Sequence, residues 1–278
     1  MEIKIGNQTH KFNTPLIMGI LNITPDSFWS HSRYTTPVEV FTAMERMVEE
    51  GAGIIDLGAA STRPDATTPS ATQEWMRLSP VLSELRRHFP NVIISVDTIH
   101  SAIVERVYNV IGPCIINDIS AGEGDHAMFP TAARLQLPLI AMHKRGTPQT
   151  MQQCTEYQNI LSEVHDYFAS TLARAKEVGI PQIILDPGFG FAKTTGQNYQ
   201  LLANLPALFT FPDVPRLVGI SRKSMIYKPL SISPDEALPA TSALHLYALQ
   251  QGVDILRVHD VAQAVQTVQL YALLTHSS

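Results

Sequence analysis

Short apolar runs alternate with amphipathic stretches from residue 16 to the end of the chain. The runs are rich in Val, Ile and Leu and contain few polar residues, which is typical of parallel strands covered on both faces. We expect eight such strands, at residues 16–21, 54–57, 92–96, 114–116, 139–142, 183–185, 217–220 and 255–259. Helical patterns follow at residues 37–51, 73–88, 101–110, 160–179, 198–208, 234–251 and 261–274.

Eight strands, seven of them followed by a helical pattern, favour a (β/α)8 barrel, because crossovers between parallel strands are right-handed and the ring then closes on itself. A doubly wound open sheet is the alternative. It needs a Gly-rich phosphate-binding turn after its first strand, and residues 19–22 (GILN) are not one. Residues 1–15 predict a hairpin with a turn at Gly6-Asn7 that covers one end of the barrel. We expect residues 1–278 to form a single domain.

Composition narrows the classes of function. The chain has 278 residues, 45% of them apolar and 16% charged, which suits a globular protein with a large core. The net charge is −5 and there is no run of Lys and Arg, so nucleic acid is not an expected partner. No apolar run approaches the length of a membrane span. Two cysteines form no pairing pattern, which favours a reducing cytoplasm.

Polar side chains gather where the expected strands end, and active sites of (β/α)8 barrels lie at the carboxyl ends of the strands. These residues are Asn22, Thr62, Arg63, Asp97, Asn117, His143, Asp186, Lys223, Arg257 and His259. Structural explanations exist for single members. Asp186 could cap the Pro-Gly turn that follows it, and Asn117 with Asp118 could cap the next turn. The whole set at one rim is hard to explain by capping.

Arg257 and His259 are two residues apart on one strand, so both side chains point the same way. With Asn22 on the neighbouring strand they suit an anionic group, such as a phosphate, and a metal ion. A structural alternative for Arg257 is an ion pair with Asp254 or Asp260.

A second group at the rim suits a flat polar heterocycle, because it offers both donors and acceptors. Its members are Asp97, Asn117, Asp186 and Lys223. Residues 188–193 (GFGFAK) do not have the spacing of a phosphate loop. HExxH, GxSxG and paired-Cys motifs are absent from the sequence, so hydrolysis by zinc or a serine nucleophile has no support.

Seven blocks in order along the chain resemble the bacterial dihydropteroate synthase family. They read MGILNITPDSF at 18–28, STRP at 61–64, SVDT at 95–98, IND at 116–118, LDPGFGF at 185–191, GISRKS at 219–224 and RVHD at 257–260. The resemblance implies a dimeric (β/α)8 barrel that is the sulfonamide target of folate synthesis. It implies condensation of 6-hydroxymethyl-7,8-dihydropterin diphosphate with 4-aminobenzoate, releasing diphosphate.

The resemblance also implies roles for individual residues. The implied pterin contacts are Asp97, Asn117, Met142, Asp186, Gly219 and Lys223. The implied diphosphate contacts are Asn22, Arg63, Arg257 and His259, with Mg²⁺ held at Asn22. The implied aminobenzoate contacts are Phe28, Thr62, Arg63, Pro64, Phe191 and Ser224. The implied catalytic residues are Asp97, Lys223, Arg257 and His259.

The chain departs from the family pattern in a few places. Ala59-Ala60 replaces Gly-Glu before the STRP block, and Asp65 and Ala192 stand where Gly is common. Residues 29–31 (WSH) replace Ser-Asp-Gly, and residues 143–145 (HKR) are more basic than usual. Two alternatives remain at this point. A pterin-dependent methyltransferase domain shares the fold but would lack the GISRKS and RVHD blocks, and a non-catalytic paralogue would bind pterin without turnover.

Overall fold

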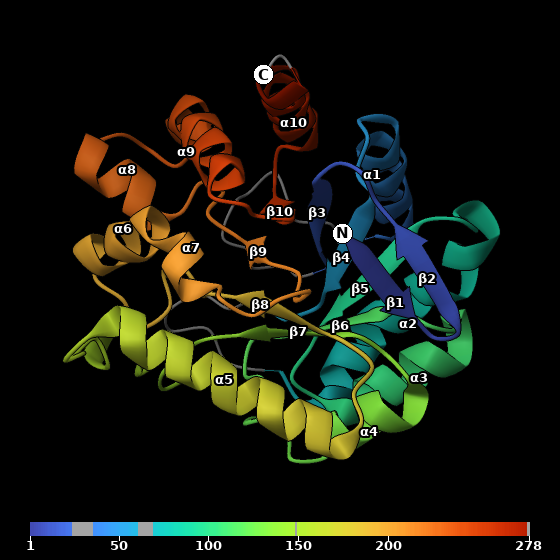
Figure 1. Cartoon of the computed structure of the whole chain (residues 1–278). Coiled ribbons are helices and arrows are strands. Elements are labelled where there is room, and N and C mark those ends of the chain that lie inside the picture. Colours follow the sequence, from blue (N-terminus) through green and yellow to red (C-terminus); the bar gives the residue numbers. More distant parts are fainter. Residues whose placement is uncertain (24–35, 61–68, 148, 277–278) are drawn as a thin grey trace.

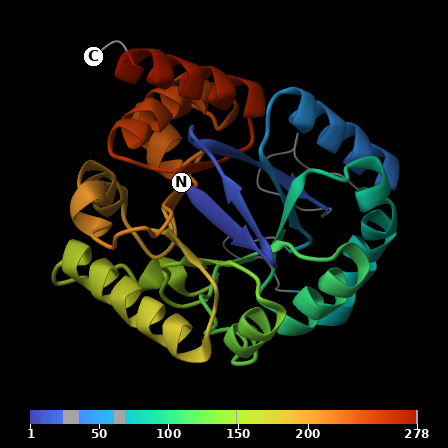
Figure 2. The same ribbon diagram turned by 45° about the vertical axis from the view of Figure 1, so that its right-hand side comes forward.

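Eight parallel strands form a ring with helices around it (Figures 1 and 2). The structure is a computed structural model of the chain and describes residues 1–23, 36–60, 69–147 and 149–276. The strands are β3 (Leu16–Asn22), β4 (Ile54–Gly58), β5 (Ile93–Asp97), β6 (Ile115–Asp118), β7 (Leu139–Met142), β8 (Ile183–Asp186), β9 (Leu217–Val218) and β10 (Ile255–Val258).

The sheet closes into a barrel. Its hydrogen-bonded order is β8-β7-β6-β5-β4-β3-β10-β9. Strands that are consecutive in the chain therefore lie side by side, and the last strand, β10, also pairs with the first strand of the barrel, β3. A parallel bridge between Leu185 and Arg216 joins the two ends of this order, and the Leu185 N–H donates to the Pro215 carbonyl at 3.0 Å. The predicted (β/α)8 barrel is therefore confirmed, and the open sheet is excluded.

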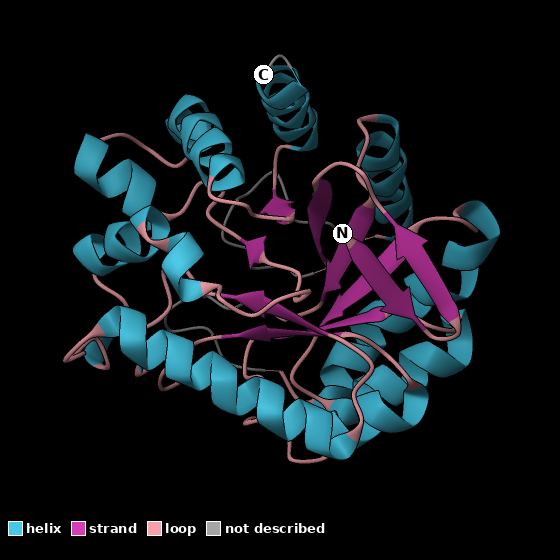
Figure 3. Ribbon diagram, in the orientation of Figure 1, coloured by secondary structure: helices cyan, strands magenta, loops and turns pink. Residues whose placement is uncertain are grey.

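Helices cover the outer surface of the barrel (Figure 3). They are α1 (Pro37–Glu49), α2 (Ala71–His88), α3 (Ser101–Ile111), α4 (Met128–Leu135), α5 (Ile160–Val178), α6 (Thr195–Ala203), α7 (Leu205–Leu208), α8 (Ser224–Leu230), α9 (Leu238–Gln250) and α10 (Val261–His276), with 3-10 turns η2 (Met151–Gln153) and η3 (Asp235–Ala237). No helix within the described ranges is both long and apolar enough to cross a membrane.

The helices differ from the prediction in three main places: the helix predicted at 198–208 is divided, and α4 and α8 were not predicted. The helix predicted at 198–208 is divided into α6 and α7. Pro206 has no N–H with which to continue the hydrogen-bond ladder, so the chain ends one helix at Ala203 and begins another at Leu205. The helix α4 is absent from the sequence prediction. It has eight residues, includes Pro130, and has no side-chain cap, so its pattern is too short to recognise.

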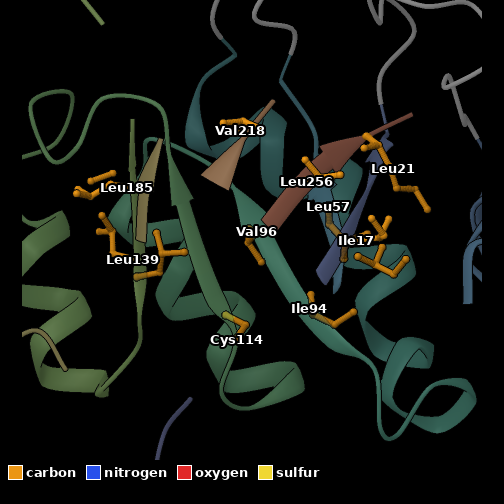
Figure 4. Close-up of a cluster of buried hydrophobic side chains, with 14 of the residues drawn as sticks. Ile17, Leu21, Leu57, Ile94, Val96, Cys114, Leu139, Leu185, Val218 and Leu256 are labelled. Atoms are coloured by element: carbon orange, nitrogen blue, oxygen red, sulfur yellow. The ribbon is translucent and has the colours of Figure 1, made fainter. Parts of the chain in front are cut away.

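The outward faces of the strands form the larger core. Residues such as Leu57, Val96 and Leu185 lie between the strands and the helices in Figure 4, and each is fully buried. Because the inward faces are covered as well, nearly every strand position is apolar. This explains why the runs in the sequence do not alternate.

The predicted N-terminal hairpin covers the amino-terminal end of the barrel. Strands β1 (Glu2–Ile5) and β2 (Gln8–Lys11) pair antiparallel and lie across that end in Figure 2. Ile3 is fully buried among inward-facing residues from the barrel strands, including Ile54 and Ile115. The Gly6 N–H also donates to the Gln136 carbonyl at 3.1 Å. Apolar packing therefore fills the end of the barrel opposite the rim of polar residues.

Candidate active site

The inner face of the barrel changes from apolar to polar toward the carboxyl ends of the strands. Residues two apart on a strand face the same side, so Asp56 lies above Ile54 and Asn117 lies above Ile115. The inward-facing apolar residues at the amino-terminal end of the barrel, such as Ile54 and Ile115, form an apolar floor. Six further residues lie two or four positions after a floor residue on the same strand and therefore also face inward, namely Ser95, Asp97, Met142, Asp186, Gly219 and Arg257. The polar layer therefore rests directly on a packed apolar layer.

Arg257 lies between two carboxylates. Its Nε donates to Oδ2 of Asp56 at 2.7 Å, and its Nη2 donates to Oδ2 of Asp97 at 2.8 Å. The same Oδ2 of Asp56 accepts a hydrogen bond from Nδ2 of Asn117 at 2.9 Å. Asp56 is fully buried. Oδ2 of Asp56 therefore binds both Asn117, which the sequence analysis assigned to the pterin contacts, and Arg257, which it assigned to the diphosphate contacts.

The structural alternatives proposed for Arg257 are wrong. Asp254 accepts the backbone N–H of Arg216 at 2.9 Å, and Asp260 forms a two-bond ion pair with Arg222 at 2.8 and 2.9 Å. Arg257 therefore points into the barrel, with its guanidinium within the polar layer.

Asp97 is a carboxyl group in an environment that disfavours its charge. Burial raises the pKa of Asp97 to about 7, opposed by the positive charge of Arg257 and reinforced by the negative charge of Asp56. The proton affinity of this group is therefore poised near neutral pH. A ligand that donates N–H groups to Asp97 would favour its ionised form.

Asp186 is both a cap and a rim residue. Its Oδ1 accepts the backbone N–H of Gly188 at 2.8 Å, which is the turn contact that the structural explanation required. Its Oδ2 has no hydrogen-bond partner in the described part of the chain. Burial raises the pKa of Asp186, while the charge of Lys223 opposes that rise. The turn therefore fixes one oxygen and leaves the other for a ligand.

Lys223 lies across the barrel mouth beside the aromatic loop that follows β8. Its Nζ donates to the Phe189 carbonyl at 2.6 Å and lies 5.0 Å from the centre of the Phe191 ring. A methyl group on Gly219 would lie 3.8 Å from this Nζ, so Gly219 is adjacent to it. Burial lowers the pKa of Lys223 to about 8, opposed by Asp186.

A second lysine, which the sequence reasoning did not use, holds this loop in place. Nζ of Lys193 donates to the carbonyls of Gly188 and Phe191, each at 3.0 Å, and lies 3.0 Å from Nδ1 of His143. Both Lys193 and His143 are buried. His143, predicted at the rim, is therefore a supporting residue that contacts Lys193. The Tyr157 hydroxyl also donates to the Ala192 carbonyl at 3.1 Å, and Ala192 has a positive φ of 51°.

Replacing Gly188 with alanine is expected to destabilise the protein by about 3 kcal/mol. Gly188 has φ of +67°, and a Cβ at this position would lie 2.1 Å from the His143 carbonyl oxygen, so the backbone itself must move. Chemical denaturation measures the loss. Gly179→Ala is the matched control, because Gly179 has φ of +84° but open space around it, so only backbone strain of about 1 kcal/mol is expected. Equal losses for the two variants would contradict the contact argument.

Asn22 and Asp97 converge over Gly58. The three residues are register partners on neighbouring strands, and a Cβ on Gly58 would lie 3.1 Å from Asn22 Oδ1 and 3.7 Å from Asp97 Oδ2. Gly58 therefore lets an amide oxygen and a carboxylate approach each other. No group of three His, Cys, Asp or Glu side chains that could hold a metal is found within residues 1–23, 36–60, 69–147 and 149–276.

His259 follows the end of β10, and its backbone N–H donates to Ser221 Oγ at 3.2 Å. Burial lowers the pKa of His259 to about 3, reinforced by Arg257 and by two other cations, Arg222 and Lys223. The imidazole is therefore neutral at pH 7 and is surrounded by positive charge, which is a setting that attracts an anion.

The residues expected near the aminobenzoate are only partly described. Phe191 is half-buried against Lys223, and Ser224 begins α8 directly after that lysine. The other four, Phe28, Thr62, Arg63 and Pro64, lie outside the described residues, as do the departures at 29–31 and Asp65.

Asp56 is the residue of this site that the sequence reasoning missed. A signal was present, because Asp56 is a lone carboxylate inside the apolar run Ile54-Ile55-Asp56-Leu57. It shares the inward face with Ile54 and has fully buried neighbours on both sides. A charge in such a run needs a buried partner, so it pointed to a cation elsewhere in the barrel.

The chain is similar to known proteins along most of its length. Residues 18–259 match the family described as pterin binding enzyme. The dihydropteroate synthase of Escherichia coli K12 is 40% identical over 258 residues, covering 92% of this chain and 90% of that protein. Two solved structures are also similar over nearly the whole chain. The Yersinia pestis dihydropteroate synthase with a sulfonamide drug has a TM-score of 0.93 at 35% identity, covering 100% of both chains. The Burkholderia cenocepacia dihydropteroate synthase complexed with 7,8-dihydropteroate has a TM-score of 0.86 at 33% identity, covering 99% of this chain and 97% of that one.

Proposed function

Because the chain belongs to the dihydropteroate synthases of the pterin-binding enzyme family, we propose that it joins 6-hydroxymethyl-7,8-dihydropterin diphosphate to 4-aminobenzoate. The products are 7,8-dihydropteroate and diphosphate, the reaction belongs to folate synthesis, and the enzyme is a transferase. The observation that carries the assignment is the polar layer at the barrel mouth, where Asp97, Asn117 and Arg257 meet through shared hydrogen bonds. We also propose that sulfonamides compete with 4-aminobenzoate, as the drug complex of the Yersinia pestis relative suggests.

The pterin ring is proposed to lie on the polar layer. Asp186 Oδ2 and Asp97 offer acceptors to its N–H groups, and Lys223 offers a donor to a ring oxygen or nitrogen. Met142 and Gly219 belong to the same inner face and would contact the ring without competing for its hydrogen bonds. The apolar floor beneath this layer excludes water, which strengthens these contacts.

The diphosphate is proposed to lie at Asn22, Arg257 and His259, with Arg63 contributing from outside the described residues. The positive surroundings of His259 suit an anion, and its neutral ring can donate one N–H to a phosphate oxygen. As the C–O bond to diphosphate breaks, Arg257 and His259 stabilise charge on the leaving group. The electron-rich dihydropterin ring shares the positive charge on its methylene, and the neutral aryl amine attacks that carbon. The proton that the amine then loses leaves with the diphosphate or passes to water.

Magnesium fits this arrangement as an ion that the protein and the substrate would hold together. The Asn22 amide oxygen is a hard donor of the type that Mg²⁺ accepts, and Mg²⁺ commonly uses one protein group together with substrate phosphates and water. When bound, the ion would neutralise charge on the departing diphosphate. The fixed residues of the chain then orient the reactants and exclude water, with Asp97 and Lys223 holding the ring in place during the displacement.

Removing Mg²⁺ with a chelator is expected to weaken the diphosphate substrate while leaving the affinity for the diphosphate-free pterin unchanged. The physical reason is that the ion would be held by Asn22 and the diphosphate and would supply no contact to the pterin ring. Calorimetric titration of both ligands, with and without chelator, measures the difference. Asn22→Ala should abolish the magnesium effect. If the chelator weakens both ligands equally, the ion is not held at the diphosphate.

A turnover assay tests the function directly. Diphosphate release should depend on 4-aminobenzoate and should be accompanied by 7,8-dihydropteroate formation. Methyl transfer from a methylated pterin would identify the methyltransferase alternative. Tight pterin binding with no release of diphosphate would identify a non-catalytic paralogue.

We further propose that the enzyme is a homodimer. Large apolar side chains are exposed on adjacent helices at the end of the chain, where Leu270 and Leu273 on α10 are 57% and 66% exposed and Tyr247 on α9 is 37% exposed. Leu270→Glu with Leu273→Glu should halve the mass measured by sedimentation. Met76→Glu is the control, because Met76 is equally exposed on α2. An unchanged mass in the double variant would place the interface elsewhere.

The remaining proposals concern the number of domains, the cellular location and the binding partners. We propose that residues 1–278 work as one domain, since the first and last strands of the barrel are hydrogen-bonded to each other through β3 and β10. We propose a cytoplasmic location, supported by the two cysteines, Cys114 and Cys154, which are both free thiols. The proposed partners are the two small-molecule substrates and a second copy of the chain.

A further inference from the structure

The buried carboxylate of Asp56 connects the two proposed halves of the site through a single oxygen. Its Oδ2 accepts from Asn117 at 2.9 Å, on the pterin side, and from Arg257 at 2.7 Å, on the diphosphate side. Its other oxygen, Oδ1, has no hydrogen-bond partner among the described residues. Oδ2 therefore carries both contacts, and neither of the two partners can move without affecting the other.

The Asp56 carboxylate also decides which way the Asn117 amide faces. A carboxylate has no donor, so Asn117 must turn its NH₂ group toward Asp56 and keep its Oδ1 on the other branch of the amide. That branch is the one left for a ligand, because Asn117 shares the inner face with Asp97 across their strand register. Asn117 is thereby made an acceptor for a ligand N–H.

Arg257 is fixed by the same group. Asp97 holds one terminal nitrogen of Arg257, but Asp97 is also a proposed pterin contact and must share its acceptor capacity with the ring. Asp56 is fully buried, whereas the side chain of Asp97 is 15% exposed, so Asp56 is the partner that stays out of reach of the ligand. Its bond to Nε can persist while Asp97 changes partners.

We infer that Asp56 is a positioning residue that fixes the acceptor face of Asn117 for the pterin and the guanidinium of Arg257 for the diphosphate, so that the two subsites are energetically linked. This inference rests on the proposed function. It assigns Asp56 no contact with either substrate. Asp56 must therefore affect the pterin through Asn117 and the diphosphate through Arg257. This dependence on a particular neighbour distinguishes positioning by Asp56 from a general structural role.

The test is a pair of double-mutant cycles read by calorimetry on the full-length protein. The probes are 6-hydroxymethyl-7,8-dihydropterin without diphosphate, and inorganic diphosphate with Mg²⁺. Asp56→Asn keeps the shape of the side chain, removes its charge and lets its amide donate as well as accept. It should weaken each probe on the order of tenfold. In steady-state kinetics it should raise KM for the pterin substrate and leave KM for 4-aminobenzoate unchanged.

The cycles assign these losses to particular neighbours. In an Asn117→Ala background, Asp56→Asn should cause no further loss of pterin affinity, and in an Arg257→Ala background it should cause no further loss of diphosphate affinity. In the latter background it should also raise the melting temperature, because it removes a buried charge that has lost its partner. Additive losses in both backgrounds would overturn the inference, since Asp56 would then act by loosening the whole barrel.

Asp254→Asn is the matched control. Asp254 is also a carboxylate, but it lies just before β10, outside the inner face, and accepts the Arg216 backbone N–H at 2.9 Å, so both affinities should stay unchanged. If Asn117→Ala and Arg257→Ala weaken their probes but Asp56→Asn weakens neither, the site assignment stands and the inference is wrong. If Asn117→Ala leaves the pterin affinity unchanged, the assignment of the pterin subsite and the inference both fail.

Discussion

Asp186→Asn is expected to weaken binding of the diphosphate-free pterin by about 100-fold or more while leaving the fold intact. In the carboxylate, Oδ2 can accept an N–H donor from the ring, whereas the amide of asparagine turns a donor toward that N–H. The loss therefore includes both an absent charge-assisted bond and a contact between two donors. The oxygen of the substituted amide can still accept the Gly188 N–H, which is the bond that shapes the turn.

Calorimetry on the free pterin measures this loss, and thermal unfolding checks the fold. Asp125→Asn serves as the control, because Asp125 also caps local backbone, accepting the Ser101 N–H at 2.8 Å, but lies before α4 and outside the inner face. It should lower stability without changing pterin affinity. An unchanged pterin affinity in Asp186→Asn would show that Asp186 is only a turn cap.

Arg257→Ala is expected to weaken inorganic diphosphate roughly 100-fold and to destabilise the fold by about 3 kcal/mol near neutral pH. The second effect follows from the structure, because the substitution leaves Asp56 and Asp97 in the barrel without their shared cation. A smaller loss is expected for the free pterin, since Asp97 and Asn117 lose their fixed geometry.

The destabilisation of Arg257→Ala should depend on pH. Burial already raises the folded-state pKa of Asp97 to about 7, and Arg257 opposes that rise, so its removal raises the pKa further. The folded state then binds a proton more tightly than the unfolded state, and stability falls as pH rises from the unfolded pKa through the folded one. The stability difference from the parent protein should thus be smaller near about pH 5 than near about pH 8.

Denaturation at both pH values measures this, with Arg86→Ala as the control. Arg86 is also half-buried, but its contacts within the described residues are to the backbone carbonyls of Val92, Ile111 and Pro113 rather than to a carboxylate. It should cost stability without altering diphosphate affinity. If the stability loss of Arg257→Ala does not change with pH, then removing Arg257 does not raise the pKa of Asp97 and this explanation of the loss is wrong.

The barrel was predictable because its strands are buried on both faces, so that apolar runs stand out against the loops. The same feature hid part of the site. Asp56 could have been found by its place beside Ile54, but the identity of its partners could not, since Asn117 and Arg257 come from strands 61 and 201 positions away. Hydrogen bonds across the interior of a barrel depend on register, and register follows from packing that a local pattern does not encode.

Loop geometry was the other gap. The sequence placed Gly188 and Phe191 in a turn after the strand, but the lysine that organises this turn bonds to backbone carbonyls, which every residue has. No residue type therefore marks such a contact in advance. The buried pair of Lys193 and His143 became recognisable only once the two loops were side by side.

The hairpin closes the amino-terminal end of the barrel, so the proposed substrate site can be reached only from the opposite end. Ile3 and the apolar floor close the far end, so substrates and products must use the same passage. The pterin, which is proposed to lie on the polar layer above this floor, has to enter before the 4-aminobenzoate that is proposed to lie nearer the mouth at Phe191. Excess 4-aminobenzoate should then obstruct the next pterin, so that initial rates pass through a maximum as its concentration rises.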